Sequence, residues 1–202
     1  MASFQTVPEM LLHRISATPD NTAFSYPVGS GWKQVSWKQF GEQVRQVSMG
    51  LRAIGLQNEE RVAILSHTRY EWVVVDMGIL GAAGATTTIY PSNLPDECEY
   101  IINDSGTRYV FAENDEQVAK LVAVRAKIPT IKNVITIDGK GSADGWVISL
   151  NDLIEKGKAA TQAEWETICK SVKNQDIATL IYTSGTTGKP KGVILTQDCW
   201  VY

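Results

Sequence analysis

The sequence of 202 residues has little cysteine, little net charge and no long apolar segment, and each absence excludes a class of protein. Its three cysteines, Cys98, Cys169 and Cys199, are far apart and form no C-x-x-C or metal-ligand spacing, so we expect free thiols in a reducing cytosol. The formal net charge of −3 gives no electrostatic reason to expect binding to nucleic acid or to an acidic membrane.

Apolar segments are short as well. The longest run, residues 72–85, contains Asp76 and falls below the roughly 20 residues that a membrane-spanning helix needs, so we expect a buried helix there. Met1 to Leu12 lacks a basic start and an apolar stretch, so we expect no secretory signal. These features predict a soluble cytoplasmic protein and leave peripheral contact with a membrane open.

What the sequence does contain is a regular alternation of predicted strands and helices. A β-hairpin is expected around Gly29-Ser30-Gly31, and then a helix that begins at a capping box of Ser36 and Gln39 and ends at Gly55. Further strands are expected at 61–66, 85–90, 109–112, 133–138 and 178–182, and helices at 70–83, 95–103, 115–127, 150–156 and 162–172. This order predicts an α/β fold, in which a hairpin precedes a parallel-rich sheet with helices on both faces.

Two groups of glycines need separate explanations. Gly78, Gly81 and Gly84 are spaced G-x-x-G-x-x-G inside the apolar helix, whereas a dinucleotide-binding fingerprint opens a helix directly after a strand. We therefore expect these glycines to allow close contact between helix and sheet. The stretch GKGSADG, residues 139–145, is expected to form a surface loop.

The segment IYTSGTTGKPKGVILT, residues 181–196, places glycine, hydroxyl, lysine and proline residues between two apolar runs. A Walker A loop is excluded, because Gly185 and Gly188 are separated by only two residues and Lys189 is followed by Pro190 instead of a hydroxyl residue. A plain hairpin turn needs far fewer such residues. The pattern predicts a strand, an anion-binding loop and a second strand.

The residues of this loop suit phosphate groups. Its glycines let backbone N–H groups face an anion, and its lysines, Lys189 and Lys191, supply positive charge. Hydrogen-bond donors come from four hydroxyl side chains: Thr183, Ser184, Thr186 and Thr187.

The segment TSGTTGKPKG resembles the phosphate-binding signature of the adenylate-forming enzymes, which include acyl-CoA synthetases, the adenylation domains of peptide synthetases, and luciferases. Residues 61–106 and the helix SWKQFGEQVRQVSMGLRAIGL are similar to long-chain fatty-acid–CoA ligases, so the resemblance covers nearly the whole chain. It implies ATP, Mg²⁺ and coenzyme A as cofactor and co-substrates, and Thr183 as a residue that reaches the metal. It implies phosphate binding by Thr183, Ser184, Gly185, Thr186, Thr187, Gly188 and Lys191.

The same resemblance implies that a fatty acid is activated to an acyl-adenylate and then transferred to coenzyme A. Residues 1–202 would be the N-terminal part of the large AMP-binding domain, with the rest of that domain and a small domain bearing a catalytic lysine beyond them. We therefore expect no catalytic residue in this chain and no activity from it alone. One departure is Gln197, where many members carry a histidine, because glutamine cannot titrate near neutral pH.

Two alternatives stay open. The acid could be an aryl, short-chain or amino acid instead of a fatty acid, or the chain could be a non-catalytic α/β module that binds a nucleotide or a partner protein. Acyl chain length and oligomeric state are not specified by the sequence. His13 and His67 have no carboxylate or nucleophile at a telling spacing, so we expect structural or surface roles for both.

Overall fold

The computed structural model describes residues 4–183 and 189–201. Its helices are α1 (Val7–Ala17), α2 (Trp37–Ala53), α3 (Tyr70–Gly81), α4 (Pro95–Ser105), α5 (Asp115–Ala123), α6 (Leu150–Gly157) and α7 (Gln162–Ser171), with short 3₁₀ turns η1 (Arg125–Lys127) and η2 (Gln197–Cys199). Its strands are β1 (Thr22–Val28), β2 (Gly31–Ser36), β3 (Arg61–Leu65), β4 (Ala85–Ile89), β5 (Tyr109–Ala112), β6 (Asn133–Thr136), β7 (Val147–Ser149), β8 (Ile177–Thr183) and β9 (Lys191–Thr196).

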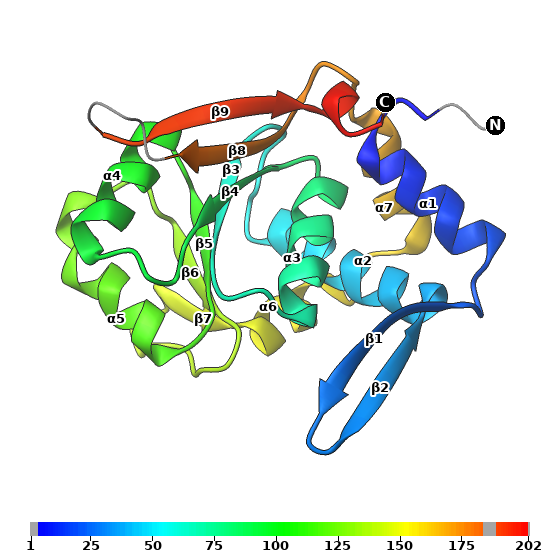
Figure 1. The fold of residues 1–202 in the computed structure, drawn as a ribbon, viewed down its shortest axis with the longest axis horizontal. Coiled ribbons are helices and arrows are strands. Elements are labelled where there is room, and N and C mark those ends of the chain that lie inside the picture. Colours follow the sequence, from blue (N-terminus) through cyan, green and yellow to red (C-terminus); the bar gives the residue numbers. More distant parts are fainter. Residues whose placement is uncertain (1–3, 184–188, 202) are drawn as a thin grey trace.

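The main sheet has the strand order β7-β6-β5-β3-β4-β8-β9 (Figure 1). Strands β3 to β8 are parallel, and only β9 runs antiparallel to its neighbour β8. Strands β1 and β2 form a separate antiparallel hairpin that projects from the body. The prediction of a parallel-rich sheet preceded by a hairpin is confirmed.

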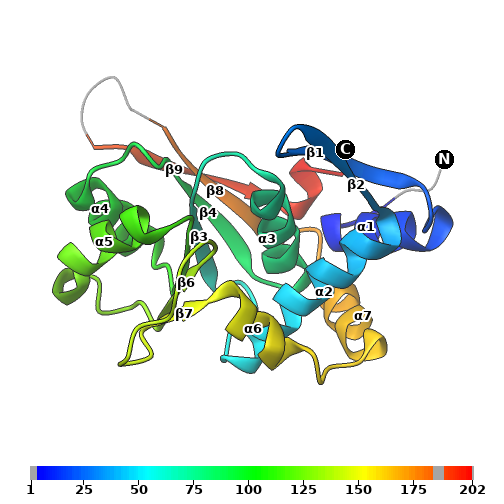
Figure 2. The same cartoon turned by 90° about the horizontal axis from the view of Figure 1, so that it is seen from below.

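Helices cover both faces of this sheet, as the alternation of strands and helices predicted (Figure 2). In β3, Val62 and Ile64 belong to a core shared with α1, α2, α3, α6 and α7, whereas Ala63 and Leu65 belong to a core shared with α4 and α5. All four side chains are fully buried. Successive residues of a strand point to opposite faces, which is why a continuous apolar run forms a strand covered on both sides.

The predicted helix signals are present. The Ser36 hydroxyl accepts a hydrogen bond from the Gln39 amide at 3.3 Å, and the Ser36 amide donates to the Gln39 side chain at 2.9 Å. After α2, Gly55 has a φ of 95°, a conformation that favours glycine. Residues 139–145 lie in the connection between β6 and β7, in agreement with the predicted loop.

The predicted contact of the glycines of α3 with the sheet was wrong. A Cβ atom on Gly78 would lie 2.5 Å from Cγ1 of Val47 in α2, and one on Gly81 would lie 2.9 Å from Nε1 of Trp165 in α7. Gly84 lies beyond the end of α3. The glycines therefore allow α3 to approach its neighbouring helices, because two helix backbones come closest where side chains are absent.

Helix α1 and strand β7 were not predicted from the sequence. Helix α1 carries a start signal: the Thr6 hydroxyl accepts from the Glu9 amide at 3.3 Å, and Pro8 occupies the first turn. Strand β7 has only three residues, which is too short for a period of two to be recognised.

Candidate functional site

The ribbon of β8 and β9 brings together the two predicted phosphate-binding residues that the structure describes. Thr183 and Lys191 are partners in the antiparallel ladder, and both are exposed. Residues directly opposite in such a ladder project from the same face. The side chains of Thr183 and Lys191 therefore project from the same face where the ribbon ends.

The other predicted phosphate-binding residues lie outside the described part of the chain. They are Ser184, Gly185, Thr186, Thr187 and Gly188. Their contacts with phosphate stay a prediction.

The next pair along the ribbon explains the last glycine of the motif. Gly192 is opposite Tyr182, and a Cβ atom on Gly192 would lie 3.0 Å from Cζ of the Tyr182 ring. Tyr182 is buried. The absence of a side chain at Gly192 leaves room for the Tyr182 ring to pack against the ribbon. The sequence did not indicate this role.

A cavity of about 630 Å³ lies at the carboxyl ends of β3 and β4. Strand β3 lies between β4 and β5. The chain passes from β3 to β4 on one side of β3, and then from β4 to β5 on its other side. In open α/β sheets, ligands bind at the carboxyl edge where the strand order reverses in this way. The cavity is lined by Ser66, His67, Thr68, Trp72, Thr88, Ile89, Tyr90, Pro91, Ser92, Glu116 and Gln117.

His67 has a carboxylate partner that its sequence neighbours do not reveal. Its Nδ1 lies 2.7 Å from Oε2 of Glu113, and its backbone amide donates to the same oxygen at 3.0 Å. Burial raises the pKa of Glu113, but the hydrogen bonds from His67 and the charge of Arg69 lower it by more, so the pKa lies below its ordinary value. The expectation of a purely structural or surface role for His67 overlooked this pair, because 46 residues separate its members.

Gln117 adds an unpaired acceptor to the same cavity. The residue is 2% exposed, and its Oε1 has no hydrogen-bond partner within residues 4–183 and 189–201. A buried acceptor of this kind is normally satisfied by a donor, either from water or from a bound ligand.

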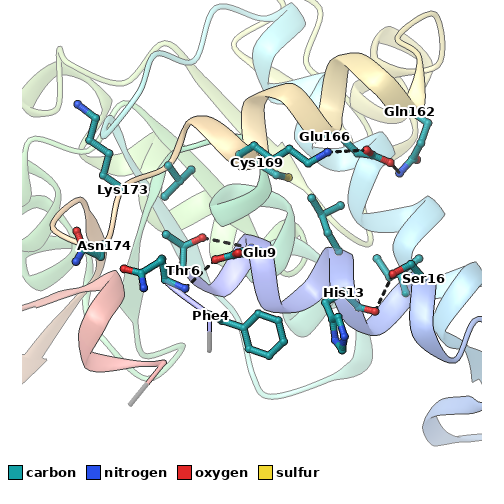
Figure 3. Close-up of a pocket in the computed structure, with 15 residues that line it drawn as sticks. Phe4, Thr6, Glu9, His13, Ser16, Gln162, Glu166, Cys169, Lys173 and Asn174 are labelled. Atoms are coloured by element: carbon teal, nitrogen blue, oxygen red, sulfur yellow. Dashed lines mark hydrogen bonds and ion pairs between the residues drawn. The ribbon is translucent and has the colours of Figure 1, made fainter. Parts of the chain in front are cut away.

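His13 lies elsewhere, in a groove of about 820 Å³ between α1 and α7 (Figure 3). Its ring packs on Phe4 with a centroid distance of 4.9 Å. The nearest charged residues on α7 pair with each other, since Lys170 Nζ lies 3.1 Å from Glu166 Oε2. We therefore place His13 outside the candidate site.

Gln197 has a structural position. The residue is 1% exposed, and its Oε1 accepts a hydrogen bond of 3.1 Å from the backbone amide of Val7, the first residue of α1. The first amides of a helix have no partner within the helix and need one from outside. Gln197 thereby joins the end of β9 to α1, 190 residues away in the sequence.

Gln197→Ala is expected to lower the free energy of unfolding by about 1–2 kcal/mol, because it removes this hydrogen bond and leaves the partly buried amide of Val7 without its partner. Urea denaturation followed by circular dichroism measures the change. Gln34→Ala, in the exposed part of β2, is the control and should change stability by less than about 0.5 kcal/mol. Equal stability of the two variants would show that the contact of Gln197 contributes nothing.

Metal and membrane features are limited in the part of the chain that the structure describes. No three His, Cys, Asp or Glu side chains there are grouped so that they could hold a metal ion. No helix among the same residues combines the length and the apolar character needed to cross a bilayer.

Cys98 and Cys169 are buried free thiols and Cys199 is an exposed free thiol, in agreement with the free thiols predicted from the sequence.

Comparison with known proteins adds the decisive observation. Residues 11–202 match the family described as AMP-binding enzyme. The chain belongs to this family. The match confirms the resemblance read from TSGTTGKPKG and from the segments before it, which covers nearly the whole chain.

Relatives of this AMP-binding chain include fatty-acid ligases. It is 32% identical over 196 residues to long-chain-fatty-acid–CoA ligase FadD15 of Mycobacterium bovis, and 30% identical over 194 residues to long-chain-fatty-acid–CoA ligase ACSBG2 of Xenopus laevis. These alignments cover 97% and 96% of this chain but 32% and 26% of the relatives. The chain thus spans about a third or less of the length of these relatives.

A similar solved structure is the anthranilate CoA ligase AuaEII in complex with anthranoyl-AMP. Its TM-score is 0.81 at 25% identity, and the match covers 98% of this chain and 36% of that one. The similarity in fold therefore covers almost all of this chain.

Proposed function

We propose that this AMP-binding chain is the phosphate-binding part of a long-chain fatty-acid–CoA ligase. The observation that carries the proposal is the pairing of Thr183 with Lys191 at the ends of a TSGTTGKPKG loop. The proposal is further supported by two relatives named long-chain-fatty-acid–CoA ligases. In the proposed reaction a fatty-acid carboxylate attacks the α-phosphate of ATP, and pyrophosphate leaves. The thiol of coenzyme A then takes the acyl group from the acyl-adenylate, and AMP is released.

The first step joins two anions, so the protein must neutralise charge and align the reacting groups. We assign Lys191 to this task, because its ammonium is exposed at the end of the ribbon and a lysine is a strong donor to phosphate oxygens. The hydroxyl of Thr183, on the same face, donates a second hydrogen bond. Neither residue forms a covalent bond with the substrate.

The described residues offer Mg²⁺ a single ligand in this assignment, the hydroxyl of Thr183. A threonine hydroxyl is an oxygen ligand of the kind that Mg²⁺ accepts beside phosphate oxygens, so Thr183 would hold it at one position. When bound, the ion would neutralise further phosphate charge.

A second candidate is activation of an aryl acid. It is favoured by the similarity to AuaEII, an anthranilate CoA ligase. The two candidates share the chemistry of the loop and differ in the acid that is bound.

The test measures pyrophosphate release by the full-length protein that contains this chain, with Mg²⁺, ATP and a panel of acids. Long-chain fatty acids should support release, and added coenzyme A should give the acyl thioester. Release with benzoates alone would replace the first candidate by the second, and no release with any acid would overturn both. The 202-residue chain by itself should form no acyl-CoA, because it spans about a third or less of such relatives.

A further inference from the structure

Helix α4 lies beside the β8–β9 ribbon (Figures 1 and 2), and its side chains bind both arms near the paired residues Thr183 and Lys191. On the arm that enters the loop, the Tyr182 hydroxyl donates to Oδ2 of Asp104 at 2.7 Å. On the arm that leaves it, the Tyr100 hydroxyl donates to the carbonyl oxygen of Pro190 at 2.9 Å. The same helix therefore binds the chain just before and just after the loop.

These two contacts come from one face of the helix. Tyr100 and Asp104 are four residues apart, a spacing that places side chains on neighbouring turns of an α-helix. Their partners, Tyr182 and Pro190, directly precede Thr183 and Lys191 in the sequence. Helix α4 therefore contacts both arms at the end of the ribbon where Thr183 and Lys191 pair in the ladder.

Tyr100 makes a second contact with the departing arm. The ammonium of Lys189 lies 5.0 Å from the centroid of the Tyr100 ring, within the range of a cation–π interaction. This contact holds the charge of Lys189 over α4. Lys191 is then the lysine left at the end of the ribbon, opposite Thr183.

The hydroxyl of Tyr182 stays protonated and so remains a hydrogen-bond donor to Asp104. Burial first, and then its hydrogen bond to the Asp104 carboxylate, raise the pKa of Tyr182 above its ordinary value. Its ring packs closely against Gly192, where a Cβ atom would lie 3.0 Å from the ring atom Cζ. The hydroxyl therefore keeps its proton and its direction across the physiological pH range.

We propose that Tyr100 and Asp104 are positioning residues, which hold Thr183 and Lys191 in the arrangement that receives the ATP phosphates. This inference rests on the proposed function. Side chains that are already held in their binding arrangement lose less conformational entropy when a phosphate binds, so ATP binding avoids part of the cost of ordering Thr183 and Lys191. Neither residue touches the reacting atoms.

Tyr100→Phe in the full-length enzyme is the test, because it removes the hydroxyl and keeps the ring under Lys189. We expect the KM for ATP to rise about three- to tenfold, the loss expected for one hydrogen bond, while kcat at saturating ATP stays within about twofold. Asp104→Ala should have the same effect, whereas Asp104→Asn, which keeps an acceptor oxygen for Tyr182, should restore most of the affinity. Tyr26→Phe, on the hairpin, is the matched control and should leave both constants unchanged.

A second measurement separates this inference from the proposed function. Hydrogen–deuterium exchange on the 202-residue chain reports the amides of residues 182–183 and 189–192 without any substrate. Exchange at least about threefold faster in Tyr100→Phe than in wild type or Tyr26→Phe supports the positioning role even if no acid gives pyrophosphate release. Unchanged exchange together with an unchanged KM for ATP would overturn it, and the acid panel decides separately whether the full-length protein is a ligase. A loss of kcat and thermal stability without a change in the KM for ATP would likewise overturn it, since that is the result of a merely structural role.

Discussion

Lys191→Ala in the full-length protein is expected to lower kcat/KM for pyrophosphate release by about 10- to 100-fold. A hydrogen bond between charged groups contributes about 1.5–3 kcal/mol, and about 1.4 kcal/mol corresponds to a tenfold change in rate. The ammonium of Lys191 is exposed and faces the same side of the ribbon as Thr183, so its removal takes charge from the phosphate site without opening the core. Steady-state kinetics with varied ATP at a saturating concentration of the best acid measure the loss.

The comparison variant is Lys189→Ala, which removes the same charge two residues earlier. Lys189 lies over the Tyr100 ring, and an exposed cation–π contact contributes about 0.5–1 kcal/mol, so we expect a loss of at most about fivefold. Thermal unfolding of both variants should match that of wild type. Equal losses in the two lysine variants, or a loss below about threefold for Lys191→Ala, would contradict the assignment of Lys191 to phosphate binding.

The sequence predicted most of the fold because its local signals agree with its packing. The apolar run of β3 is buried on both faces, and the capping box at Ser36 forms as expected. One prediction was wrong because the same local pattern suits packing against either of two kinds of element. Glycines inside α3 allow close approach equally well to a sheet or to helices, and only the arrangement of α2 and α7 decides between them.

The candidate site was predictable in part. The loop composition pointed to Thr183 and Lys191, and the register of the ribbon places them opposite each other. The pair of His67 and Glu113 was not predictable from spacing, because its members follow different strands that only the sheet brings together. A search for polar residues just after each predicted strand would have found both.

Asp76 is a titratable residue that has no part in the proposed phosphate-binding site. Its carboxylate lies on α3 in a narrow, largely apolar cavity of about 170 Å³ with Trp72, Met77 and Leu80. The Thr86 hydroxyl donates to its Oδ1 at 2.6 Å. Burial raises the pKa of Asp76 to about 6, and the hydrogen bond from Thr86 lowers it only in part.

The direction of the resulting pH dependence follows from the two states of the chain. The pKa of Asp76 is about 6 in the folded protein against an ordinary value of 3.8, so the folded protein holds this proton more tightly. Below about pH 4 the group is protonated in both states and has no effect. As the pH rises from about 4 to 6, the unfolded chain releases the proton first, and the free energy of unfolding falls.

Asp76→Asn is therefore expected to become more stable than wild type as the pH rises, by about 2 kcal/mol at pH 7.5, and to show little difference near pH 4. A shift of one pKa unit corresponds to about 1.4 kcal/mol, and Asp76 is not fully shielded from solvent, which reduces the full value. Urea denaturation at a series of pH values gives the difference between variant and wild type, which cancels the other titrating groups. Asp96→Asn removes an aspartate charge whose side chain is 87% exposed, so its difference from wild type should stay flat within about 0.5 kcal/mol. A difference for Asp76→Asn that is equally flat would show that the folded protein holds the Asp76 proton no more tightly than the unfolded chain does.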